Sequence, residues 1–230
     1  PRRVNPLLAF GANLVLESLG LSGPRAPADS DENNSGETEI GDTKSISSLR
    51  QKAGSVTVVI GRRESGKTVV AYRLAELLGR PIYAVTPEEH PPKGVIELDL
   101  EELDELPPPY STLFLDDLPA YMGTHDYSNK FVRVVEKLVP VVRHRRKVHL
   151  VFATQLASLS DKYALDADLV ILKPPSLLYQ DLERAAVRRF QDAAAPFWEG
   201  KSDNWVQRHC FLLANQERGI VRVQKPGFMG

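Results

Sequence analysis

The chain has 230 residues, of which 42% are hydrophobic, and this fits one sizeable α/β domain with an appendage. Its formal net charge of −1 excludes a globally basic nucleic-acid-binding protein, so any DNA contact would need a local basic patch or charge pooled from several subunits. The single cysteine, Cys210, excludes a disulfide framework and a cysteine-rich zinc site, which suits a reducing compartment. The sequence contains no apolar run of about 18 residues, so it predicts no membrane-spanning helix.

Two segments precede the main domain. Residues 1–21 predict an amphipathic helix, because their apolar stretch is interrupted by Asn13, Glu17 and Ser18. We expect this helix to pack on a core or on a neighbouring subunit, and docking on a membrane or capsid surface is the alternative. Residues 22–54 are rich in Pro, Ser, Asp, Glu, Asn and Gly, which bury little apolar surface, so we expect a flexible linker there.

The main domain, expected at residues 55–230, alternates short apolar runs with helical patterns. Strands are predicted at residues 55–60, 81–85, 111–117, 148–155 and 168–172, with a further short run at 95–100. Helices are predicted at residues 68–78, where Gly79 is the C-terminal cap, at about 128–146, where Pro140 is a candidate kink, and near 178–194. Residues 211–223 predict a hairpin. This alternation predicts an α/β fold: a mostly parallel sheet covered by helices on both faces, with a C-terminal β-hairpin.

The sequence GRRESGKT at residues 61–68 matches the phosphate-binding pattern G-x-x-x-x-G-K-[ST], between a predicted strand and a predicted helix. Its glycines let the backbone wrap closely, so that successive N–H groups form an anion nest at the start of the helix. We expect Lys67 to reach the β and γ phosphates of ATP, and the Thr68 hydroxyl to bind Mg²⁺. This pattern therefore predicts an ATPase rather than a plain glycine-containing turn. Its candidate nucleotide-binding residues are Gly61, Arg62, Arg63, Glu64, Ser65, Gly66, Lys67 and Thr68.

Polar residues end two further predicted strands. LFLDD places Asp116 and Asp117 after an apolar strand, at the edge of an α/β sheet where ligands bind. We expect Asp116 to hold Mg²⁺ and Asp117 to orient and deprotonate the attacking water. VHLVFATQ ends in Gln155, for which two interpretations stay open. The amide either senses or positions water near the γ-phosphate, or forms a hydrogen bond that satisfies the strand end.

A basic run, RHRRK at residues 143–147, directly precedes the strand that ends in Gln155. Three interpretations stay open: a solvated helix face, phosphate contacts to DNA, and an arginine that reaches the nucleotide of a neighbouring subunit. An arginine supplied in trans stabilises the charge of a phosphoryl-transfer transition state. Arg143 and Arg146 are the candidates for that role.

Other polar side chains receive structural interpretations. Arg184, Arg188 and Arg189 lie at helical spacing, and we interpret them as a solvated face. Cys210 lies in an apolar run and is expected to pack in the core. The histidines show no metal-ligand spacing, so no metal is assigned to His125, His144, His149 and His209.

Taken together, GRRESGKT, LFLDD and RHRRKVHLVFATQ resemble the FtsK–HerA branch of P-loop motor ATPases, which includes the small genome-packaging ATPases of membrane-containing viruses. The most specific part is the arginine-bearing approach to a strand that ends in Thr-Gln. The resemblance covers residues 55–173 and implies a RecA/ASCE-type fold, with Lys67, Thr68, Asp116 and Gln155 in the nucleotide site. It further implies ATP and Mg²⁺ as cofactors and a homo-oligomeric ring, expected to be a hexamer, that moves double-stranded DNA through a central pore.

Two features depart from this family. Its members usually have Asp-Glu where this chain has Asp116 and Asp117, and the arginine that cellular FtsK proteins carry near the next strand is absent from DADLVILKPPS. The short chain favours a viral or mobile-element genome-packaging ATPase, in the cytoplasm and associated with a virion. The alternatives are a small-molecule kinase, an assembly or morphogenesis ATPase, and a helicase loader of the AAA+ class.

Overall fold

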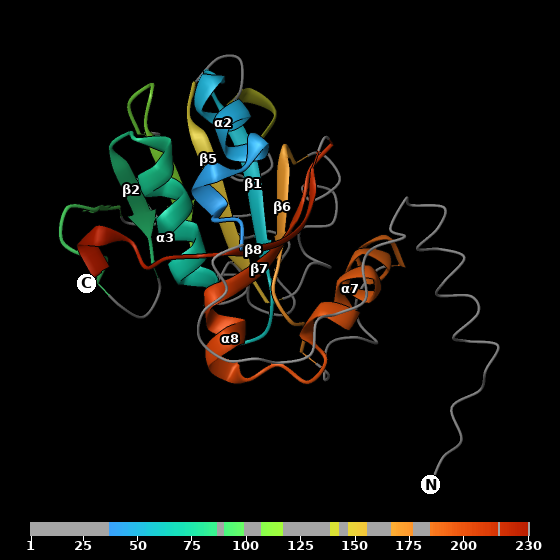
Figure 1. The fold of residues 1–230 in the computed structure, drawn as a ribbon. Coiled ribbons are helices and arrows are strands. Elements are labelled where there is room, and N and C mark those ends of the chain that lie inside the picture. Colours follow the sequence, from blue (N-terminus) through green and yellow to red (C-terminus); the bar gives the residue numbers. More distant parts are fainter. Residues whose placement is uncertain are drawn as a thin grey trace, which may run out of the picture. The chain divides into compact units, whose positions relative to one another are not determined.

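The computed structural model describes residues 37–86, 90–98, 107–116, 139–142, 147–155, 167–176, 185–215 and 217–229. Within these ranges lies one sheet of eight strands with the order β3-β2-β4-β5-β1-β6-β7-β8 (Figure 1). The strands are β1 (Ser55–Ile60), β2 (Ile82–Val85), β3 (Ile96–Glu97), β4 (Thr112–Leu115), β5 (His149–Thr154), β6 (Leu169–Leu172), β7 (His209–Leu213) and β8 (Arg218–Arg222). Neighbours from β3 to β6 pair in parallel, whereas β7 pairs antiparallel with both β6 and β8.

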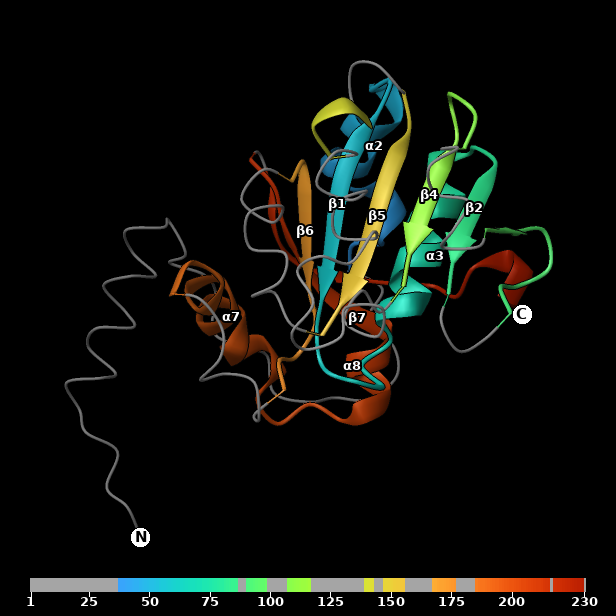
Figure 2. The ribbon, with the colours of Figure 1, turned by 180° about the vertical axis from the view of Figure 1, so that it is seen from behind.

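Helices cover both faces of this sheet. They are α2 (Lys44–Gln51), α3 (Lys67–Leu78), α7 (Ala185–Trp198) and α8 (Asp203–Arg208), with short 3-10 turns η1 (Ile40–Asp42) and η5 (Gly227–Met229). Successive side chains of a strand point to opposite faces, so Val58 of β1 packs in the same apolar layer as Val187 of α7, and Val59 packs with Val70 of α3. Figures 1 and 2 show α2 and α3 on one side of the central strands and α7 on the other. The predicted α/β fold class is therefore confirmed.

The strand order brings three sequence motifs to one edge of the sheet. Strand β5 lies between β1 and β4, with Ile60 of β1 opposite Thr154 and Leu115 of β4 opposite Phe152. Because the three strands run in parallel, their carboxyl ends lie at the same edge. The residues that follow β1, β4 and β5, namely the start of the P-loop, Asp116 and Gln155, are therefore neighbours in the fold.

The structure corrects the C-terminal part of the linker that was expected at residues 22–54. Residues 40–51 are not a linker but form η1 and α2, and Ile40, Ile46 and Leu49 are buried against the α3 side of the sheet. The Thr43 side chain accepts a hydrogen bond from the Ile46 amide (3.3 Å) and so caps α2. The average composition of the stretch is polar, but a few apolar residues at the right spacing are enough to dock a short helix. The part of the linker before residue 37, and the helix predicted at residues 1–21, lie outside the described residues.

Other expected elements are found with shifted boundaries. The predicted helix near 178–194 is described from Ala185 and continues to Trp198, because Phe197 and Trp198 pack against the core. The hairpin begins at His209 rather than at 211, and α8, which Ser202 caps, was not predicted. Of the helix predicted at about 128–146, only residues 139–142 are described, and these are helical.

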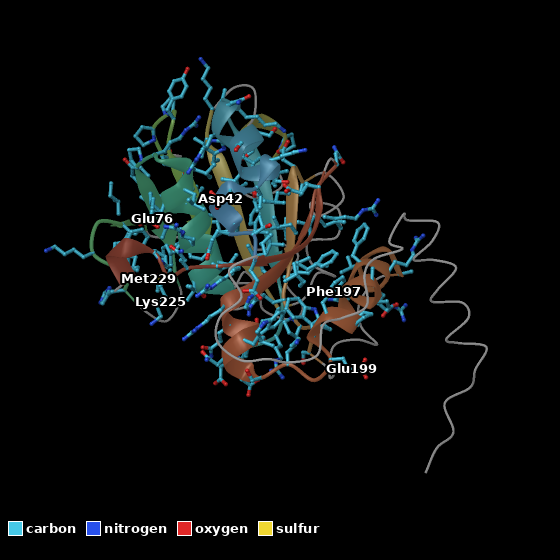
Figure 3. All side chains as sticks on the ribbon, in the orientation of Figure 1. Asp42, Glu76, Phe197, Glu199, Lys225 and Met229 are labelled. Carbon is cyan, nitrogen blue, oxygen red and sulfur yellow. The ribbon has the colours of Figure 1, made fainter. Side chains whose placement is uncertain are left out.

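The C-terminal segment returns to the face covered by α3. The Gly227 amide donates to Oε1 of Glu76 (2.8 Å), and the rings of Phe228 and Tyr72 meet edge to face at 5.8 Å. Figure 3 shows Glu76 beside the end of the chain at Met229. The last residues thus belong to the same core as the P-loop helix.

Candidate nucleotide-binding site

The start of the P-loop is held by the strands on either side of β1. The Gly61 amide donates to the Thr154 carbonyl at the end of β5 (3.2 Å), and the Arg62 amide donates to the Pro174 carbonyl just after β6 (2.8 Å). Gly66 has a φ of 85°, a left-handed conformation that glycine adopts without strain, and α3 begins directly after it. The loop therefore delivers the N-terminus of α3, with its N–H groups, to the carboxyl edge of the sheet.

The side chains of the loop divide into an inner and an outer set. The Lys67 ammonium donates to the Arg62 carbonyl (2.7 Å), and the Ser65 hydroxyl donates to the same oxygen (2.8 Å). Both of these side chains are buried, whereas Arg62, Arg63 and Glu64 are exposed. The Lys67 ammonium thus lies across the loop. A phosphate group bound in the loop would be a suitable partner for this positive charge.

A hydrogen bond joins the P-loop to the acidic motif. The Thr68 hydroxyl donates to Oδ2 of Asp116 (2.9 Å), and the Asp116 amide donates to the Val85 carbonyl of β2 (3.0 Å). These two side chains are 48 positions apart in the chain, and both present oxygen atoms of the kind that Mg²⁺ prefers. Within the described ranges no three His, Cys, Asp or Glu side chains gather as a metal site, so a cation here would also need phosphate or water oxygens.

Gln155 follows β5 directly and is half-buried at the same edge of the sheet. Strand β5 lies between the P-loop strand and the strand that Asp116 follows, and this position agrees with either interpretation of the Gln155 amide. The candidate base Asp117 and the candidate trans-acting Arg143 and Arg146 lie outside the described residues.

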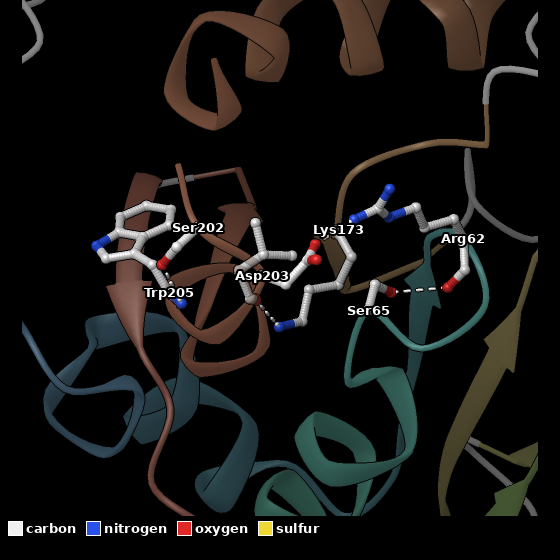
Figure 4. Close-up of polar contacts among 7 residues, drawn as sticks. Arg62, Ser65, Lys173, Ser202, Asp203 and Trp205 are labelled. Carbon is white, nitrogen blue, oxygen red and sulfur yellow. Dashed lines mark hydrogen bonds and ion pairs between the residues drawn. The ribbon is translucent and has the colours of Figure 1, made fainter. Parts of the chain in front are cut away.

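Lys173 is a component of this region that the sequence analysis missed. It follows β6 directly, is only 1% exposed, and donates from Nζ to three backbone carbonyls, of Val206, Gln207 and His209. Figure 4 shows its side chain between the P-loop and the C-terminal segment that carries Asp203. The signal in the sequence is a lysine directly after an apolar strand, as in DLVILK, and it is weak because most such lysines are exposed.

The remaining polar candidates have structural roles where they are described. Burial is the main cause that lowers the pKa of His149 to about 4, and its Nδ1 shares a hydrogen bond with the Ser55 hydroxyl (2.7 Å). Burial raises the pKa of the Cys210 thiol to about 12, so this cysteine packs as an apolar residue, as predicted. Arg188 and Arg189 on α7 are exposed, which agrees with the solvated face expected for them.

Sequence comparison finds no matching protein family and no matching curated protein. Among solved structures, the genome-packaging NTPase B204 of Sulfolobus turreted icosahedral virus 2, in complex with AMPPCP, is similar at a TM-score of 0.50 and 15% identity, over 76% of this chain and 100% of that one. The DNA-packaging ATPase B204 of Sulfolobus turreted icosahedral virus gives 0.49 and 14%, over 74% and 98%. EccC of Thermomonospora curvata (ATPases 2 and 3) gives 0.47 and 13%, over 78% and 38%. At 15% identity, the first likeness shows a shared fold.

Proposed function

We propose that this chain is an ATPase motor of the FtsK–HerA branch that moves double-stranded DNA, and that it packages the genome of a virus or a mobile element. The observation that carries the ATPase part is the hydrogen bond between Thr68 of the P-loop and Asp116 (2.9 Å). It joins the two motifs that a P-loop ATPase uses to hold a nucleotide and its metal ion. A chance match to the loop pattern would not be expected to meet a strand-ending carboxylate in this way.

In this proposal each residue acts through a contact of its own. The backbone N–H groups of the P-loop and the Lys67 ammonium bind the phosphates, since both present positive charge at the start of α3. Thr68 and Asp116 hold Mg²⁺, which, when bound, neutralises part of the phosphate charge. Gln155 positions the attacking water, and Asp117 takes its proton.

The motor part of the proposal rests on the sequence resemblance together with the shared fold. The resemblance to genome-packaging ATPases rests on the P-loop, the LFLDD strand and the Thr-Gln strand. The fold is shared with B204, a genome-packaging NTPase, over the whole length of that chain. The net charge of −1 makes ring assembly part of the proposal, because a polyanion is held better when several subunits present their basic groups together.

The test measures ATP hydrolysis with and without double-stranded DNA, together with the oligomeric state. We expect a ring whose ATPase rate rises when double-stranded DNA is added, and no hydrolysis by Lys67→Ala, which should remain folded. DNA-independent phosphate transfer to a small acceptor would instead favour a small-molecule kinase. Hydrolysis that DNA does not stimulate would argue against the motor and favour an assembly ATPase.

A further inference from the structure

Lys173 contacts the end of helix α8, and both pack against the P-loop. The Lys173 ammonium donates to the carbonyls of Val206 (2.7 Å), Gln207 (3.0 Å) and His209 (2.7 Å), which belong to the last turn of α8 and the start of β7. The Val206 carbonyl also accepts from the amide of His209, the C-cap of α8, and a cation is favourable beside the carbonyls at the C-terminus of a helix. A lysine ammonium has three N–H donors, so its donors match the three acceptors.

The glycines of the P-loop pack against this assembly. A Cβ atom at Gly61 would lie 2.4 Å from Cβ of Lys173, which is too close for any side chain. A Cβ atom at Gly66 would lie 3.0 Å from the Gln207 carbonyl oxygen and 3.5 Å from Nζ of Lys173. The two loop glycines are therefore in close contact with Lys173 and the end of α8, and a displacement of α8 would change the space that bounds the loop.

The other end of α8 contacts the outer side of the loop. The Arg62 guanidinium pairs with Oδ1 of Asp203 (2.8 Å), the first residue of α8, and both side chains are exposed (Figure 4). Ser202 caps this end by accepting from the Trp205 amide (3.2 Å). The helix thus contacts the loop at both of its ends, through a buried ammonium at one and an exposed ion pair at the other.

We propose that α8 braces the P-loop, with Lys173 and Asp203 as positioning residues that keep the loop in the shape that binds nucleotide phosphates. This inference rests on the proposed nucleotide-binding function and extends it to the C-terminal segment. Neither residue touches the phosphates in this scheme. Each acts through the backbone of residues 61–66, whose N–H groups must converge on one anion.

The charge of Lys173 makes the brace sensitive to pH. Burial is the main cause that lowers the pKa of Lys173 to about 8; Lys67 on α3 adds to the decrease, and Cys210 on β7 opposes it. The last turn of α8 presents the backbone carbonyls of Val206 and Gln207 to the ammonium. Loss of a proton leaves two N–H donors for three acceptors, so one of the three hydrogen bonds that tie Lys173 to the end of α8 and the start of β7 must break.

The first experiment measures ADP binding by calorimetry and amide hydrogen exchange of the nucleotide-free protein, for the parent chain and Lys173→Met. Methionine has a similar length but provides no donor. We expect the dissociation constant for ADP to rise about tenfold or more and the amides of residues 61–66 to exchange faster. In the parent chain the affinity should fall as the pH rises through about 8, and in Lys173→Met this dependence should be absent. A folded variant with parental affinity, parental exchange and parental pH dependence would show that the inference is wrong.

The second experiment uses the exposed end of α8, where a substitution does not endanger folding. Asp203→Ala should weaken ADP binding about two- to fivefold, as expected for an exposed ion pair. Glu199→Ala is the matched control, because Glu199 is an exposed carboxylate on the same C-terminal segment (Figure 3) and should leave the affinity unchanged. Equal affinities for these two variants would contradict the brace at Asp203.

The outcomes also separate this inference from the proposed function. If the parent chain does not bind ADP, the proposed function fails. The exchange rates of the loop amides in the nucleotide-free protein still test the brace in that case, because they need no ligand. Faster exchange in Lys173→Met, confined to the P-loop, supports the brace, and unchanged exchange contradicts it.

Discussion

Asp116 and Asp117 are adjacent in the chain, and we expect them to do different work. The Asp116 carboxylate accepts from the Thr68 hydroxyl (2.9 Å), so Asp116→Asn removes a negative charge where a metal ion would bind. We expect this variant to weaken Mg²⁺-dependent ATP binding. Asp117→Asn should instead leave Mg·ATP binding intact and slow hydrolysis about 10²- to 10⁴-fold, as expected for loss of a general base. Titration of ATP with and without Mg²⁺, beside single-turnover hydrolysis, separates the two. The same defect in both variants would contradict separate roles.

His149 gives the fold a predicted sensitivity to acid. It lies at the start of β5 and is buried, and its pKa is lowered to about 4 in the folded chain from 6.5 in the unfolded one. Above pH 6.5 both states are neutral, but between pH 6.5 and 4 the unfolded chain takes up a proton that the folded chain does not. Stability is therefore complete above pH 6.5 and is lost as the pH falls toward 4, by up to about 3 kcal/mol.

Denaturant unfolding of the parent chain and of His149→Gln at pH 7 and pH 5 measures this effect. The loss of stability between the two pH values should be clearly smaller in His149→Gln, because the variant has no proton to gain at this site. Equal losses in both proteins would assign the acid sensitivity to other groups.

At the scale of elements, α2 is the part of the chain whose role changed most from expectation. Ile46 is fully buried against the α3 side of the sheet, so Ile46→Ala should lower the free energy of unfolding by about 2–4 kcal/mol. Ser48→Ala on the exposed side of the same helix is the control and should change it by less than about 0.5 kcal/mol. Chemical denaturation compares them. An equal effect of the two substitutions would restore the linker interpretation.

At the scale of the whole molecule, the basic run at residues 143–147 remains a prediction of contact between subunits. Of this run only Lys147 is described. The residues that flank the run are joined by a hydrogen bond, in which the Val148 amide donates to the Val142 carbonyl (3.2 Å). These described flanks lie where β5 begins, and a strand of six residues spans about 20 Å. The P-loop lies at the other end of the strands. The described flanks of the run thus lie away from the P-loop of the same subunit, and a role for Arg143 or Arg146 in a neighbouring subunit stays a prediction.

Mixed rings test that prediction. Rings made only of Lys67→Ala subunits, or only of subunits in which Arg143 and Arg146 are replaced by Ala, should not hydrolyse ATP. Mixing the two kinds should restore part of the activity, because an intact P-loop can then lie beside an intact arginine of the next subunit. Mixtures that assemble into rings but stay inactive would show that the arginines act in cis or on DNA.

Local patterns were sufficient to predict the P-loop, the helix that follows it and the buried strands. Gly66 and Gly79 both adopt the left-handed conformation, and α3 runs between them from Lys67 to Leu78. These features depend on a few neighbouring residues, namely a glycine before the helix, a glycine after it, and an apolar run on each side. Such short-range rules hold whatever the rest of the chain does.

Which of these elements meet is set by packing between distant parts of the chain. The placement of β5 between β1 and β4, and hence the meeting of Thr68 with Asp116, depends on the pairing of strands far apart in the chain. The burial of Ile46 and of Lys173 depends on surfaces supplied by other segments, so a polar stretch became a packed helix and a lysine became a buried cation. Neighbouring residues in the sequence were enough to predict the P-loop with its phosphate-binding pattern. The supports behind the loop come from long-range packing, which local composition does not encode.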